Sequence, residues 1–221
     1  TTHGSEKNPK LCAGCHLNRL TGTDVATGKP ATSAGHLFLA IPCLDAGGLP
    51  DLADPDGCAH DVPSRSWAAC TASGCHGSAT SAVSAFALSE QRIDQLVAQI
   101  WDDTNGNDAI DAAPTDGGYL SDKVNVPNTE YVTNDNKITP AEGARFNVRM
   151  LREGGADGSH GVHNPFLAEA LLRAHIDELK ATYPGLAPVA PAVQDIMKGP
   201  LGAVTKRPLL RPLIARPAAS Q

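Results

Sequence analysis

Aromatic side chains are scarce in this sequence of 221 residues, because Phe, Trp and Tyr together make up only 4 % of it. Large aromatic side chains usually contribute much of the buried area of a globular core. Their scarcity argues against a core built mainly on protein aromatics, and the 21 Gly and 17 Pro residues predict long irregular stretches. The sequence therefore predicts a loop-rich protein whose core is thin unless another group fills it.

Two further absences narrow the class of protein. The formal net charge of −6 argues against the basic surface that nucleic-acid binding requires. No apolar run approaches the ~18–20 residues that cross a bilayer, so we expect no membrane span. The sequence starts at Thr1 without an initiator Met, as a processed secreted chain does, so we expect an extracellular or periplasmic location.

Two cysteine motifs carry the most specific chemistry. Residues 11–17 read Leu-Cys-Ala-Gly-Cys-His-Leu, and residues 70–76 read Cys-Thr-Ala-Ser-Gly-Cys-His. Cys-x-x-Cys-His is the attachment motif of a c-type haem, in which the cysteines form thioethers with the porphyrin and the histidine ligates the iron. Cysteine pairs also build zinc sites, but zinc has no need of a His directly after the second Cys in both motifs.

The motifs therefore predict two haem c groups. The attachment cysteines are Cys12, Cys15, Cys70 and Cys75, and the proximal iron ligands are His16 and His76. Buried porphyrins would also supply the flat apolar bulk that the aromatic content lacks.

A six-coordinate haem needs a second axial ligand, usually His or Met. Met150 and Met197 have no special setting, whereas six histidines remain outside the two motifs. We therefore expect bis-histidine ligation, with His163 and His36 as distal ligands; His36 follows a Gly and precedes an apolar run that could line a porphyrin. The reserves are His3, His60 and His160. We expect His175 to be an ordinary helix residue.

The segment around His163 carries a family resemblance. Residues 159–172 read Ser-His-Gly-Val-His-Asn-Pro-Phe-Leu-Ala-Glu-Ala-Leu-Leu. They resemble the distal-ligand segment of multihaem c-type cytochromes, including the nitrite-reductase and related families, in which Gly-Val-His-Asn-Pro supplies a distal His just before a long helix. Those cytochromes also use the longer cysteine spacing of residues 70–76. Only two attachment motifs are present and no Lys replaces a proximal His, so the resemblance does not extend to reductase activity.

The two remaining cysteines, Cys43 and Cys58, flank a stretch rich in Gly, Pro and Asp. In an oxidising compartment their simplest use is a disulfide that closes this loop. A third cofactor site is the competing use.

Residues 103–111 read Asp-Thr-Asn-Gly-Asn-Asp-Ala-Ile-Asp and resemble an EF-hand calcium loop. The oxygen ligands at loop positions 1, 3, 5 and 9 are Asp103, Asn105, Asn107 and Asp111. Position 6, usually Gly, is Asp108, and position 12, usually Glu, is Pro114. A bound Ca²⁺ and a degenerate, metal-free loop both remain open.

Helical periodicity dominates and no period-2 alternation marks a strand, so we expect a mainly α fold with extensive coil, organised around two haems. Helices are predicted over residues 78–88, 89–101, 139–152 and 165–183, the last being the longest. We expect a short helical turn at residues 11–17 and a loop at residues 21–33. A di-haem domain then spans residues 1–183, and a Pro-rich extended tail spans residues 184–221.

Two bis-histidine haems predict an electron carrier whose partners are redox proteins or extracellular acceptors. The surplus of His, which could ligate between subunits, and the extended tail favour a homo-polymer that forms an extracellular cytochrome wire. A soluble periplasmic di-haem carrier is the alternative. A small haem peroxidase or reductase is a third candidate, which would need an open iron position.

Overall fold

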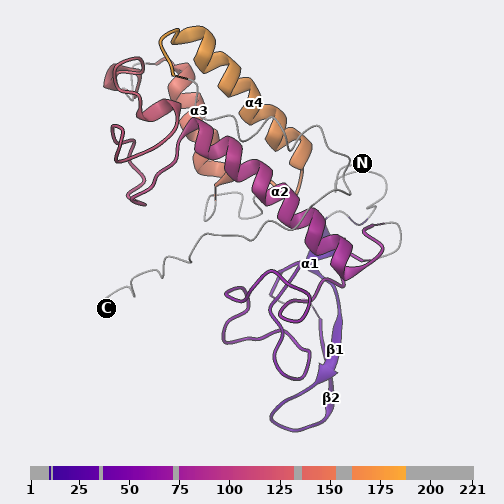
Figure 1. Ribbon diagram of the computed structural model, residues 1–221. Helices are drawn as coiled ribbons and strands as arrows, with labels where there is room; N and C mark the ends of the chain where they lie inside the picture. Colours follow the sequence, from indigo (N-terminus) through magenta and orange to yellow (C-terminus); the bar gives the residue numbers. More distant parts are fainter. Residues whose placement is uncertain are drawn as a thin grey trace.

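The structure is a computed structural model and describes residues 10, 12–34, 37–71, 75–131, 136–152 and 161–187 (Figure 1). The helices and strands within them are α1 (Cys12–His16), β1 (Leu20–Thr23), β2 (Pro30–Ser33), α2 (Ala79–Ile100), α3 (Pro140–Leu151) and α4 (Pro165–Thr182), with 3₁₀ turns at Tyr119–Ser121 and Asn128–Tyr131. The prediction of a mainly helical chain with much coil is confirmed at this level. Within the described residues, no helix is long and apolar enough to span a bilayer.

The helix bundle comprises α2, α3 and α4 with the loop of residues 101–131, and it holds the main hydrophobic core. Figure 1 shows α3 and α4 lying against the C-terminal part of α2, and all three helices contact one another. Side chains that are almost fully buried there include Ile93, Leu96, Ile100, Trp101, Val148, Leu172 and Leu179. Aliphatic residues at helical spacing thus build this half of the fold with few aromatics.

The region predicted as two helices, residues 78–88 and 89–101, is the single helix α2. Ser78 is its N-cap and accepts a hydrogen bond from the Ser81 backbone N–H, whereas Ser89, expected to be a cap, lies in the helix interior. No Gly or Pro separates the two stretches, so the hydrogen-bond ladder continues. With 22 residues α2 also exceeds α4, which has 18 and was expected to be the longest.

The amino-terminal half of α2 is much less covered than its carboxyl-terminal half. Ala82 is the only buried residue among the first fourteen positions, whereas Ile93, Leu96, Val97 and Ile100 are all buried. The uncovered half projects from the helix bundle toward α1 and the hairpin (Figure 1).

The segment expected to be a loop at residues 21–33 contains an antiparallel hairpin, in which β1 pairs with β2 from Leu20–Ser33 to Thr23–Pro30. Its small and polar side chains give no hydrophobic alternation, so the sequence pattern concealed it. Backbone contacts replace side-chain burial: the Thr23 N–H donates to the Gly47 carbonyl. A Cβ on Gly22 would meet that same carbonyl oxygen at 2.4 Å, so only Gly fits there.

Helix caps match the sequence expectations for α3 and α4. Thr139 and Glu142 form a capping box at the start of α3, with the Glu142 N–H 3.1 Å from the Thr139 hydroxyl and the Thr139 N–H 3.0 Å from the Glu142 carboxylate. At α4 the Asn164 side chain accepts from the Leu167 N–H, and Pro165 occupies the first helical position.

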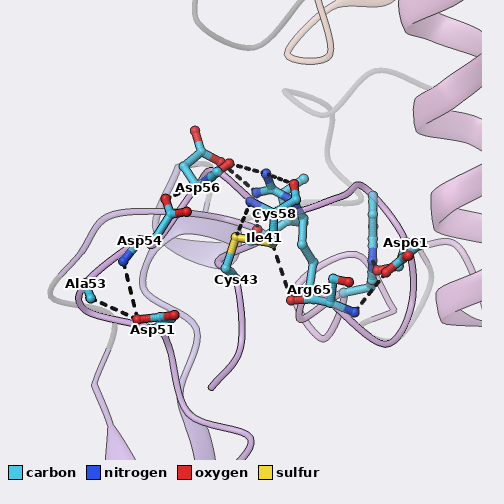
Figure 2. The surroundings of a disulfide bond; sticks show 12 residues. Ile41, Cys43, Asp51, Ala53, Asp54, Asp56, Cys58, Asp61 and Arg65 are labelled. Atoms are coloured by element: carbon cyan, nitrogen blue, oxygen red, sulfur yellow. Dashed lines mark hydrogen bonds and ion pairs between the residues drawn. A yellow bond between two sulfur atoms is a disulfide. The ribbon is translucent and has the colours of Figure 1, made fainter. Parts of the chain in front are cut away.

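The N-terminal lobe, residues 12–34, 37–71 and 75–78, is mostly irregular and is tied together by the disulfide between Cys43 and Cys58. Figure 2 shows Arg65 beside this bond; its guanidinium donates to the carbonyls of Ile41 and Cys58 and to the Asp56 carboxylate. Arg65 is only 3 % exposed, so its charge is buried but paired. The predicted disulfide is therefore present. Beside it, the Arg65 guanidinium and its oxygen acceptors form what we call the polar clamp.

Candidate haem-binding site

His16 is the last residue of α1 and is held by one backbone carbonyl. Its Nδ1 lies 2.6 Å from the Phe38 carbonyl oxygen, and the Phe38 ring stacks on the imidazole with centroids 4.6 Å apart and planes 17° apart. A carbonyl can only accept, so Nδ1 carries the proton and Nε2 keeps its lone pair. Metal-ligating histidines are commonly oriented in this way, with the other ring nitrogen bonded to a carbonyl.

Phe38 is a contributor that the sequence reasoning missed. Its φ is 52°, a left-handed conformation that costs a bulky residue about 1–3 kcal/mol. Phe38 adopts this strained conformation while its carbonyl and its ring both contact His16. The backbone strain therefore occurs at the residue that orients the imidazole. The sequence signal was only the apolar run of residues 37–41, which indicates a lining and not a carbonyl acceptor.

His163 faces His16 from a segment far away in the sequence. The two imidazole centroids are 6.0 Å apart and the ring planes are inclined at 44°. An imidazole nitrogen lies about 2 Å from a bound first-row metal, so two imidazoles on opposite sides of one iron have centroids about 6 Å apart. The pair therefore has the spacing that a bis-histidine haem requires.

Packing around Gly161 fixes the approach of His163. Gly161 is buried with φ 74°, and a Cβ there would lie 2.9 Å from Ala168 and 3.4 Å from Ile93. The glycine is therefore required by its contacts with α4 and α2. Together with the Asn164 cap, this packing sets the position of the turn that carries His163.

The two cysteine motifs lie together, although 58 positions separate their first residues, Cys12 and Cys70. Burial raises the pKa of the Cys70 thiol to about 11, and the nearby thiols of Cys15 and Cys75 add to the rise. Burial likewise raises the pKa of Cys15, with contributions from Cys75 and Cys12. All four thiols are free of disulfides.

The raised pKa values of Cys15 and Cys70 bear on whether these thiols bind zinc or attach a haem. A structural zinc site needs thiolates, and thiols that stay protonated at neutral pH must lose protons on binding. Among the described residues, no three His, Cys, Asp or Glu side chains are arranged to hold a metal ion. Thioether formation removes the ionisable group altogether, so burial does not oppose it. Burial of Cys15 and Cys70 is therefore compatible with thioether attachment, whereas zinc binding would have to displace their protons.

The second motif ends directly before α2. The His76 N–H donates to the Cys70 carbonyl, and the His76 carbonyl accepts from the N–H of the α2 cap Ser78. His76 is half-buried. This second proximal candidate is thus anchored at the end of α2 that the helix bundle leaves uncovered.

The remaining histidines divide into three groups. The candidates His36, His3 and His160 lie outside the described residues. His60 packs edge-on against Phe86, with its Nδ1 3.7 Å from the Glu90 carboxylate. The His175 Nε2 accepts from the Asn147 side-chain amide N–H at 2.7 Å, and its Nδ1 lies 3.4 Å from the Glu178 carboxylate, as expected of a helix residue.

The predicted calcium ligands are brought together in one loop after α2. The amide nitrogens of Asn105 and Asn107 each lie 2.8 Å from the same Asp111 oxygen, and Asp103 accepts from the Asn107 N–H. The amide hydrogen bonds, chiefly that from Asn105, lower the pKa of Asp111.

Comparison of the chain with family models, with curated proteins and with solved structures found no match.

Proposed function

We propose that this protein is a c-type cytochrome that binds two haems covalently and carries electrons. Cys12 and Cys15 attach one porphyrin, Cys70 and Cys75 attach the other, and His16 and His76 are the proximal ligands. A bound haem iron supplies reversible one-electron chemistry.

The observation that carries the proposal is the pair formed by His16 and His163. The imidazole of His16, which directly follows Cys15, and the imidazole of His163 have centroids 6.0 Å apart, which is about the separation that one iron between them needs. The Phe38 carbonyl holds Nδ1 of His16, which leaves Nε2 available as a ligand. Two histidine ligands close the iron to substrates, which favours an electron carrier over a peroxidase or reductase.

Adjacency of the two motifs supports transfer between haems within one chain. The Cys75 thiol is close enough to raise the pKa of Cys15, and the thiols of Cys15 and Cys75 are close enough to raise the pKa of Cys70. Porphyrins attached at neighbouring cysteines lie near each other, because each thioether fixes one edge of its ring. The chain would thus hold two redox centres at short range without moving.

A four-cysteine zinc site is the second candidate, because the same adjacency favours it. Metal analysis and absorbance separate the two. The proposal expects a Soret band, a thioether-type pyridine haemochrome spectrum and two irons per chain. Zinc without a Soret band would refute it.

The distal role of His163 has its own test. Replacing His163 with Ala should open one iron, so that the reduced protein binds carbon monoxide at one of two haems, whereas the unaltered protein binds it poorly. His175→Ala is the control, since that imidazole is engaged by Asn147 and Glu178. An unchanged spectrum and no carbon monoxide binding in His163→Ala would contradict the assignment.

We further propose that copies of the chain assemble into an extracellular wire. This proposal rests on the surplus of His and on the Pro-rich tail. Residues 188–221 of that tail lie outside the described part. Sedimentation velocity and negative-stain imaging at high concentration test it. Filaments would support it, and monomers or small oligomers alone would favour the soluble periplasmic carrier.

A further inference from the structure

The loop of residues 103–111 has the backbone geometry of a cation-binding loop. Asp103 accepts hydrogen bonds from the backbone N–H groups of Asn107 at 3.2 Å and Asp108 at 2.9 Å. Asp108, at the sixth position, has φ 60°, which is the turn that Gly makes in an EF-hand. These features form the loop, but by themselves they do not indicate a bound ion.

Asp116 provides an independent observation. It is 3 % exposed, and its Oδ2 accepts from the indole N–H of Trp101 and from the backbone N–H of Asp111, both at 2.9 Å. Its other oxygen, Oδ1, is buried and has no hydrogen-bond partner. A buried carboxylate oxygen without a partner costs free energy, and an ion or a water molecule is the usual explanation.

Contacts place this carboxylate at the loop. The bond to the Asp111 N–H holds Asp116 against the ninth position, whose own carboxylate faces Asn105 and Asn107. Burial lowers the pKa of Lys123 and the Asp111 and Asp116 carboxylates oppose that shift, so both carboxylates lie near the Lys123 ammonium group.

The carboxylates of Asp103 and Asp108, the other two acidic side chains of the loop, form ion pairs with arginines. Arg152 pairs with Asp103 Oδ2 at 3.0 Å and with Asp108, and Arg149 pairs with Asp108 as well. The charge at the sixth position is thereby neutralised, while Asp111 and the unpartnered oxygen of Asp116 have no arginine in contact within the described residues.

We propose that this loop binds Ca²⁺ and that Asp116 supplies the carboxylate that the twelfth position, Pro114, lacks. The other ligands come from Asp103, Asn105, Asn107 and Asp111. Ca²⁺ takes about 6–8 oxygen ligands, so backbone carbonyls and water complete the set. Since no three acidic side chains of the described chain already stand in metal-binding positions, the ion draws the carboxylates together by side-chain rotation.

Calorimetric titration of the whole, chelator-treated protein with CaCl₂ tests the proposal. We expect one ion per chain, with a dissociation constant below about 1 mM, the upper end for extracellular calcium modules. Asp116→Asn should weaken binding at least about tenfold. Asp177→Asn, which removes the same charge from an exposed position on α4, should leave it unchanged.

Two results would overturn the proposal: no saturable binding up to about 10 mM, a concentration well above that range, or equal affinity in Asp116→Asn and the unaltered chain. If Asp116→Asn does not fold, Asp111→Asn replaces it, because that side chain is only half-buried at the loop surface and is an equal member of the ligand set. Unchanged affinity in Asp111→Asn would count against the site in the same way.

Discussion

In the helix bundle, α2, α3 and α4 bury aliphatic side chains such as Leu96, Leu172 and Leu179 against one another. In the N-terminal lobe, the buried groups include Trp67, the half-cystine Cys43 and the charged Arg65. One region is stabilised by apolar burial and the other by a covalent link and hydrogen bonds to carbonyls. The proposed haems would add apolar burial to this lobe, which carries both cysteine motifs. The following changes test this difference.

The largest effect is expected in the helix bundle. Leu172→Ala should lower the free energy of unfolding by about 2–5 kcal/mol, because Leu172 is fully buried between helices and its removal leaves a cavity. Leu167→Ala on the same helix is the control; at 61 % exposure it should change stability by less than about 0.5 kcal/mol. Urea unfolding followed by circular dichroism measures both. Equal losses would show that α4 does not pack as described.

Removing the disulfide should act mainly on the lobe. Replacing Cys43 and Cys58 together by Ala frees a loop closed over a separation of 15 residues and should cost about 3 kcal/mol. Limited proteolysis should then cut within residues 44–57 while the helical signal of α2 to α4 persists. Val62→Ala, at an exposed position nearby, is the control. In denaturant, loss of the helical signal at the concentration that also unfolds the lobe would mean that the two regions unfold as one unit.

Arg65→Met tests the polar clamp beside the disulfide. It leaves the carbonyls of Ile41 and Cys58 without their donor, and the expected cost is about 1–3 kcal/mol. Arg149→Met removes an ion pair with Asp108 whose side chains are 48 % and 36 % exposed, and it should cost at most about 1 kcal/mol. Denaturant midpoints compare the two variants. A larger loss of stability in Arg149→Met than in Arg65→Met would contradict the conclusion that the buried Arg65 interactions stabilise the fold more than the exposed ion pair.

A cap in the helix bundle should matter less. Thr139→Ala removes the hydroxyl that accepts from the Glu142 N–H and should cost about 1 kcal/mol. Thr139→Ser keeps the hydroxyl and should restore most of the loss. Thermal melting of the two variants measures the difference, and equal melting temperatures would show that the capping box is not stabilising.

The effect that is smallest at neutral pH concerns the thiols, because it appears only as the pH rises. Burial raises the pKa of Cys70 from 9.0 to about 11 in the folded chain, so folding favours its protonated form. In the free-thiol protein this stabilisation is present below pH 9 and is lost as the pH rises toward 11. Unfolding midpoints between pH 8 and 11 should show the slope, and Cys70→Ala should reduce it. Thioether-linked protein, which lacks the ionisable group, should not show it.

Local patterns were sufficient wherever a few neighbouring residues decide the structure. Asn164 and Pro165 fix the start of α4, and Thr139 with Glu142 fixes the start of α3, because caps satisfy the first backbone N–H groups over one helical turn. Haem attachment at the two cysteine motifs stays a prediction, since it rests on the spacing of Cys and His alone. Pairing Cys43 with Cys58 required only that the other four cysteines be assigned.

Local patterns failed where distant backbone contacts decide. The hairpin of β1 and β2 depends on close approach of Gly22 to residues 47–49, which no periodicity reveals. The break expected at Ser89 was wrong because propensity alone does not end a helix that has no Gly or Pro. The role of the Phe38 carbonyl was invisible, since any residue supplies a carbonyl and only the tertiary fold selects one.

The sequence by itself determined the chemical groups: four thiols in two motifs, imidazoles to accompany them, and a row of oxygen-bearing side chains at calcium-loop spacing. Tertiary structure decided which of these groups meet. It set His163 opposite His16, joined the two cysteine motifs, and left Asp116 buried beside the loop with one oxygen unpartnered. The physical reason is that spacing along a chain fixes contacts over one or two turns, whereas contacts across 147 residues follow from how helices pack.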